Sequence, residues 1–194
     1  MLNALWLCAL GQLAPLIAVS PKHDGVIVVA FSDRDGEHKI TLNESPVEKK
    51  QKGDEWLKSA KLTVVSEVRA TKAAKWVTTW QAKDFVNDCE LDLELTVVGD
   101  SIEVTDLDDN GRAEVSFMYR LGCKSDVSPS TLKLLMYQGT TKWALRGNSK
   151  VKVGVENGNP VFAGGEVTVD GGFKGNPTLL RAAMAQWQSH VLEK

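Results

Sequence analysis

The stretch that decides the fold reads ELDLELTVVGDSIEVTDLDDNGRAEVSFMY and runs from Glu90 to Tyr119. Its first part alternates strictly, with an apolar residue at every second position and acidic or polar residues between. Such alternation is typical of an antiparallel strand with one face on a core and one in water. Residues 98–101 predict a turn, and residues 101–104 and 114–119 read as strands on either side of a loop. The residues predicted to face inward are Leu91, Leu93, Leu95 and Val97.

The loop between these strands carries oxygen-bearing side chains at alternate positions. Counted from Asp106, positions one, three, five and nine are Asp106, Asp108, Asn110 and Glu114. Gly at position six permits a sharp turn, and position seven offers the backbone carbonyl of Arg112. Because calcium takes about six to eight oxygen ligands, these five residues are predicted to hold Ca²⁺. The alternative is an Asp-rich turn that binds no metal.

The type of calcium loop can be narrowed further. A helix–loop–helix site needs an acid at position twelve, and that residue is Phe117. The pattern D-x-D-x-N-G-x-x-E between two strands instead resembles the calcium-binding hairpin of integrin-type FG-GAP repeats. The resemblance implies that the side chains at positions one, three, five and nine hold the ion. Glu114 replaces the aspartate that is commoner at position nine in that family.

A longer segment, from Asp106 to Arg146, is similar to a set of uncharacterised exported bacterial proteins. Some members of that set are labelled as surface-polysaccharide-associated. Besides the loop, the similarity is carried by YRLGCKSDVSP at residues 119–129 and LKLLMY at residues 132–137. It implies a location in the cell envelope.

The rest of the chain predicts a mainly β domain over residues 21–194, with antiparallel sheets arranged as a sandwich or a barrel. Asp35-Gly36 predicts a hairpin turn, and the polar residues 44–59 predict a surface loop. At the end of the chain, Asn176 and Pro177 precede apolar residues at helical spacing. We therefore expect an amphipathic helix over residues 176–194 that packs on a sheet; a partner-binding helix is the alternative.

Residues 1–20 form an apolar leader that is short for a membrane span. The leader resembles a secretory signal peptide, which predicts a periplasmic or secreted protein with no membrane span in the mature chain. The alternative is an apolar segment packed on the core. After cleavage, Cys89 and Cys123 would remain as one possible disulfide. A simple meander would place them at opposite ends, so the pairing is left open.

Trp76 and Trp80 are predicted to lie on the same face of one strand. Two exposed tryptophan rings would make a glycan platform, because sugar CH groups stack on aromatic rings. A layer of the core is the alternative.

Composition restricts the functional classes. Lys and Arg total 23 and Asp and Glu total 25, which gives a formal charge of −2, and nothing in the sequence favours nucleic acid. The sequence carries no nucleophile elbow, phosphate loop or dinucleotide fingerprint, and its histidines lack the spacing of zinc ligands. We therefore expect a non-catalytic, calcium-stabilised envelope or secreted protein that binds a protein or glycan of the envelope. The alternatives are an enzyme acting on cell-wall or surface polysaccharide, and an inhibitor or immunity protein.

Overall fold

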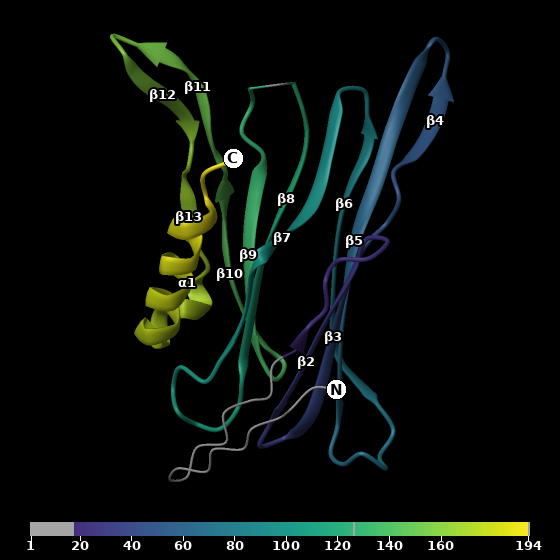
Figure 1. Cartoon of the computed structure of the whole chain (residues 1–194), viewed down its shortest axis with the longest axis vertical. Coiled ribbons are helices and arrows are strands. Elements are labelled where there is room, and N and C mark those ends of the chain that lie inside the picture. The colour runs from purple at the N-terminus through teal and green to yellow at the C-terminus, as the bar shows by residue number, and fades with distance from the viewer. Residues whose placement is uncertain (1–17, 126, 194) are drawn as a thin grey trace.

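Two antiparallel β-sheets face each other in the computed structural model, and one helix covers the outer side of the second sheet (Figure 1). The structure describes residues 18–125 and 127–193, so most of the predicted leader lies outside the described residues. The predicted mainly β, antiparallel fold with a C-terminal helix is confirmed. The two sheets are separate and form a sandwich-like arrangement.

The first sheet is formed by β1 (Ala18–Val19), β2 (Val26–Asp33), β3 (Gly36–Glu44), β4 (Glu48–Lys52), β5 (Glu55–Arg69) and β6 (Val77–Cys89). Strands β3 and β4 pair with successive parts of the long strand β5, and β6 pairs along its other edge. The surface loop predicted over residues 44–59 is wrong, because much of it forms the β4–β5 hairpin. Every residue of β4 is exposed, so this strand lacks the apolar alternation by which a strand is recognised.

The second sheet contains β7 (Asp92–Thr105), β8 (Glu114–Lys124), β9 (Thr131–Gln138), β10 (Thr141–Asn148) and β13 (Val167–Val169). Strands β11 (Lys150–Glu156) and β12 (Asn159–Gly164) form a separate hairpin. The predicted strands on either side of the loop are confirmed as the end of β7 and as β8. The turn predicted at residues 98–101 is wrong, because β7 continues through it with a register shift between Val98 and Glu103. Leu91 does not face inward as expected: it is 53% exposed, in the turn where the chain passes between the sheets.

Two apolar layers lie on either side of the second sheet. On β8, Phe117 belongs to the core between the sheets, whereas Met118 faces the helix α1 (Pro177–His190) and the short 3-10 helix η1 (Gly171–Gly175). Burial on both faces explains the nearly continuous apolar sequence of β8 and β9. The helix packs on the sheet as predicted but ends before residue 194, and the Asn176 side chain makes no capping hydrogen bond.

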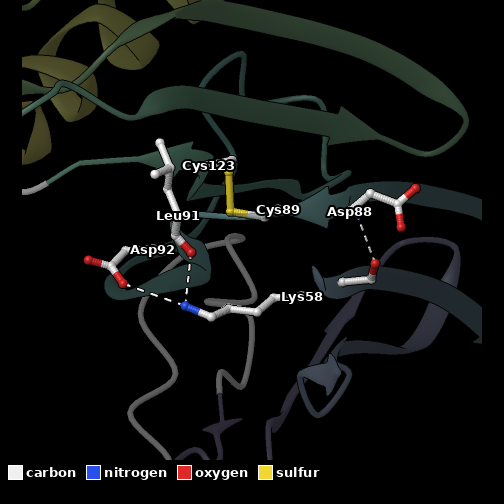
Figure 2. The surroundings of a disulfide bond; sticks show 7 residues. Lys58, Asp88, Cys89, Leu91, Asp92 and Cys123 are labelled. Carbon is white, nitrogen blue, oxygen red and sulfur yellow. Dashed lines mark hydrogen bonds and ion pairs between the residues drawn. A yellow bond between two sulfur atoms is a disulfide. The ribbon is translucent and has the colours of Figure 1, made fainter. Parts of the chain in front are cut away.

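A disulfide joins Cys89, the last residue of β6, to Cys123 on β8 (Figure 2). The expectation that a meander would separate these residues is wrong. Strands β7 and β8 form one hairpin, which returns the chain to its starting point and places Cys123 opposite Leu93. The Cα atoms of the two cysteines are therefore 5.4 Å apart, and the bond links the first sheet to the second.

No helix among the described residues is long and apolar enough to cross a membrane.

Candidate metal centre

Asp106 shapes the loop that connects β7 to β8. Its Oδ1 accepts a hydrogen bond from the backbone N–H of Asn110 at 3.0 Å, and its Oδ2 accepts one from Gly111 at 2.9 Å. Gly111 adopts φ +78°, a left-handed conformation that glycine adopts without steric cost. The carboxylate at position one and the glycine at position six therefore fold the loop together.

Three carboxylates converge at the base of this loop. Asp106, Asp108 and Glu114 each offer one oxygen, and these atoms lie within 4.8 Å of one another. Glu114 is fully buried, Asp106 is half-buried and Asp108 is exposed. A group of hard oxygen donors at this spacing can hold a metal ion.

The pKa of Glu114 is raised above its ordinary value. Burial is the largest cause, and the neighbouring charges of Asp108 and Asp106 act in the same direction, whereas a hydrogen bond from the Leu107 N–H opposes them. That N–H lies 2.7 Å from Oε2 of Glu114. A cation among the three acids would reverse the raised pKa, because it favours the ionised carboxylate.

Gln138 is a member of this group that the sequence did not reveal. It lies opposite Glu114 in the β8–β9 pairing, and its Nε2 donates to Oε1 of Glu114 at 2.5 Å. The same nitrogen is 3.4 Å from both Asp108 carboxylate oxygens and 3.5 Å from the Arg112 carbonyl oxygen. One donor thus reaches oxygens of three residues predicted as ligands. Gln138 reaches the carboxylates because the register of β9 against β8 places it opposite Glu114. The spacing of residues within the loop could not predict this contact.

The other two predicted ligands behave differently from each other. The Arg112 carbonyl faces the carboxylate group, as expected for position seven, while its side chain turns away to Asp35, with 2.8 Å from Nε to Oδ2. Asn110 braces the loop: its Oδ1 accepts from the Arg112 N–H at 2.7 Å and its Nδ2 donates to Asp108 at 2.8 Å. The structure therefore brings together the carboxylates of Asp106, Asp108 and Glu114 and the Arg112 carbonyl. The side-chain oxygen of Asn110 is not part of this group, because it accepts a backbone hydrogen bond.

The β2–β3 turn of the first sheet is hydrogen-bonded to this loop of the second sheet. The Arg34 N–H donates to the Gly111 carbonyl at 2.9 Å, and the Arg34 guanidinium donates to the Asn110 carbonyl at 2.8 Å. The Ala113 N–H donates to Oδ2 of Asp33 at 3.1 Å. The candidate centre therefore lies at a junction between the two sheets, and its folding is coupled to their packing.

Asp33 is a buried acceptor at this junction. Burial alone would raise its pKa, but hydrogen bonds from His38 and from the backbone N–H groups of Ala113 and Asp35 outweigh burial, so the pKa is lowered. His38 Nε2 lies 2.7 Å from Oδ1 of Asp33, and the His38 ring stacks on Phe31. The negative charge of Asp33 is thus stabilised in the folded protein.

No protein family, curated protein or solved structure matched this chain. The likeness of residues 106–114 to the FG-GAP hairpin therefore rests on the loop residues themselves.

The structure separates the two tryptophans that were predicted to share one face. Ser66 pairs with Trp80 but Glu67 pairs with Thr78, so a β-bulge at Thr79 interrupts the alternation. Trp80 packs inward and stacks on Tyr137, with ring centroids 3.7 Å apart. Trp76 lies on the outer face, where the charged groups of Lys39 and Arg69 are 5.0 and 4.6 Å from its ring centroid. The prediction of a joint Trp76–Trp80 platform is wrong, and for Trp80 the core alternative holds.

Proposed function

We propose that this protein is a non-catalytic binding protein of the cell envelope or of the secreted space, stabilised by Ca²⁺ in the loop of residues 106–114. Its partner is a protein or a glycan of the envelope. One observation carries the proposal. The carboxylates of Asp106, Asp108 and Glu114 and the Arg112 carbonyl lie close together, in a loop that is hydrogen-bonded to the other sheet.

The donor set favours calcium over other metals. All the converging atoms are oxygens, whereas zinc and copper sites in proteins draw on histidine and cysteine. Magnesium demands a near-ideal octahedron and keeps several waters, while calcium accepts irregular oxygen sets of higher coordination number. The irregular loop, in which Glu114 is buried and Asp106 is half-buried, therefore suits calcium better than magnesium.

The position of the loop favours a stabilising role. The turn at Arg34 and the loop at Gly111 are bonded to each other, so an ion that orders the loop also orders this contact between the sheets. A ligand that binds only the folded state adds about 2.7 kcal/mol of stability at a hundred times its Kd.

A disulfide supports export. Bonds of this kind persist in oxidising compartments and are rare in the cytosol, and Cys89–Cys123 joins strands of different sheets. Together with the apolar leader predicted over residues 1–20, the bond favours a periplasmic or secreted protein.

Thermal unfolding tests the proposal. The mature protein should melt at a higher temperature in millimolar Ca²⁺ than in excess chelator, and Mg²⁺ at the same concentration should restore less of the difference. Identical melting curves in Ca²⁺ and in chelator would reject calcium stabilisation. Recovery of the protein from the cytosolic fraction of its host cells would reject the export part of the proposal.

A further inference from the structure

Strand β6 ends the first sheet with an edge that has no strand partner. Among the residues that the structure describes, β6 pairs with β5 and with no other strand. Its register against β5 is regular from Trp80 to Val86, between two register shifts. Backbone N–H and C=O groups on the free side of this run can therefore pair with a strand added from another chain.

Two contacts between the sheets place β6 alongside β9. The ring of Trp80 stacks on Tyr137, with 3.7 Å between the centroids, and the Asp84 carboxylate forms an ion pair with Lys133. On its other side, the first sheet continues to β5, which contacts β7. The free edge of β6 therefore faces the strand of the second sheet that lies beyond β9, which is β10.

The inner face of β10 carries two cations beside this edge. In the β9–β10 pairing, Lys142 lies opposite Tyr137, and Arg146 lies opposite Lys133. Ala144, midway between the two cations on β10, belongs to the core between the sheets, so both cations are on that same face. Their side chains are exposed, because the first sheet ends at β6. We call Lys133, Lys142 and Arg146 the basic surface.

Positive charge on the basic surface exceeds the negative charge beside it. Lys133 pairs with Asp84, and Arg146 pairs with Asp170. Among the described residues, no carboxylate forms an ion pair with Lys142. The pKa of Lys142 is lowered; partial burial is the largest cause, and the charges of Arg146 and Lys133 act in the same direction. An anionic group bound beside Lys142 would relieve this repulsion.

We propose that the free edge of β6 binds an acidic peptide segment of a partner protein as an added β-strand. Neighbouring strands lie about 4.8 Å apart in each sheet, so a strand added to β6 would lie over β10 as β6 lies over β9. Every second side chain of the added strand would then point at the basic surface. Lys142 and Arg146 are four residues apart, which is about 13 Å along β10 and matches acids at positions one and five of the peptide.

Two observations favour a peptide over an acidic polysaccharide. An extended peptide offers N–H and C=O groups along its whole length for pairing with the β6 edge, and a polysaccharide does not. The aromatic rings beside Lys142 are stacked on each other, and Tyr137 is buried, so they offer a sugar ring little surface. The inference rests on the proposed function for a protein partner and names the chemistry of that partner, but it does not require calcium.

Fluorescence anisotropy with labelled octapeptides tests the inference on the disulfide-bonded protein. A peptide of alternating Glu and Thr presents acids on one face of a strand. We expect it to bind, with an affinity that falls as salt is raised, and a peptide of alternating Lys and Thr should not bind.

Backbone methylation of the acidic peptide tests strand addition separately from charge. Methyl groups on the nitrogens of every second residue block one edge of a peptide strand and leave the other edge free. Of the two complementary methylated forms, one should therefore bind roughly tenfold more weakly than the unmethylated peptide.

Variants of the basic surface test the placement of the peptide. Lys142→Gln combined with Arg146→Gln should weaken binding roughly tenfold and flatten its salt dependence. Lys142→Arg combined with Arg146→Lys keeps both charges and should bind within about threefold of wild type. Lys61→Gln with Lys83→Gln removes the same charge from exposed positions on the outer face of β5 and β6, and it should change the affinity less than about twofold.

Several outcomes would overturn the inference. They are failure of the acidic octapeptide to bind, equal binding of both methylated forms and their parent, and equal binding by the glutamine variants of the two faces. Tighter binding of polygalacturonate than of the acidic peptide would overturn it in favour of a glycan. A wild-type dimer in sedimentation equilibrium that Lys142→Gln with Arg146→Gln dissociates would overturn it in favour of a second copy of this chain.

Melting curves in Ca²⁺ and in chelator, recorded on the same samples, separate this inference from the proposed function. Absence of peptide binding with a retained calcium effect rejects the added strand alone. Peptide binding with no calcium effect rejects calcium stabilisation alone.

Discussion

The side-chain amide of Gln138 faces the buried carboxylate of Glu114 across the β8–β9 pair, with 2.5 Å between Nε2 and Oε1. The amide donates an N–H into a space bordered by oxygens of Asp108, Arg112 and Glu114. A donor in this space partly offsets the repulsion among the acids, and a divalent cation would offset it more strongly. We therefore expect the contribution of Gln138 to stability to depend on whether a cation is bound among these acids.

Replacing Gln138 should destabilise the protein most when calcium is absent. In chelator, Gln138→Ala leaves Oε1 of Glu114 without its amide donor, and an unsatisfied buried acceptor costs about 1–3 kcal/mol. In millimolar Ca²⁺ the ion would satisfy the same oxygen, so the loss should shrink. Urea unfolding under both conditions measures the effect, with the exposed Gln81→Ala as control. Equal losses with and without Ca²⁺ would contradict the prediction.

The sequence predicts much of this centre because the information is local. Spacing alone identifies Asp106, Asp108 and Glu114, and alternation alone identifies the strands on either side. The contacts from Gln138 on β9 and Asp33 on β2 depend on strand register and on sheet packing, which no short pattern encodes.

The errors of sequence interpretation have separate physical causes. Strand β4 is exposed on both faces and so lacks periodicity. A bulge at Thr79 reversed the face expected for Trp76 relative to Trp80. The β7–β8 hairpin brought Cys123 back to Cys89, where a meander was expected to separate them.

Removing the Asp33 charge should destabilise the protein in a pH-dependent way. The folded-state pKa of Asp33 is lowered, so its charge contributes stability at neutral pH, and this contribution is lost as the pH falls through the folded-state pKa. Asp33→Asn should cost about 1–3 kcal/mol at pH 7, and its difference from wild type should narrow below about pH 4.

A pH series of urea unfolding measures this difference. Asp35→Asn provides the control, because Asp35 is an exposed partner of Arg112 and exposed ion pairs contribute about 0–1 kcal/mol. A difference between wild type and Asp33→Asn that widens in acid would show that the sign assigned to this carboxylate is wrong.

Loss of the disulfide should lower stability without changing the fold. Cys89 and Cys123 are separated by 34 residues, and closing a loop of that length stabilises the folded state by about 3–4 kcal/mol in the chain-entropy estimate. The double variant Cys89→Ser/Cys123→Ser should therefore melt earlier, and wild type with reductant should approach it. Peptide mapping without reductant should recover the two cysteines linked; alkylation of both thiols in unreduced protein would contradict the bond.

Calcium titration by calorimetry tests the central claim most directly. Asp108 is the informative residue, because its carboxylate accepts from the side chains of Asn110 and Gln138, whereas the backbone bonds that fold the loop end on Asp106. Asp108→Ala should therefore keep the loop and lose a ligand. Glu103→Ala removes the same charge from an exposed position on β7.

We predict one saturable calcium site in wild type and in Glu103→Ala, with affinity roughly ten- to a hundredfold weaker in Asp108→Ala. No heat of binding in wild type at millimolar Ca²⁺, or three identical isotherms, would contradict a calcium site in this loop.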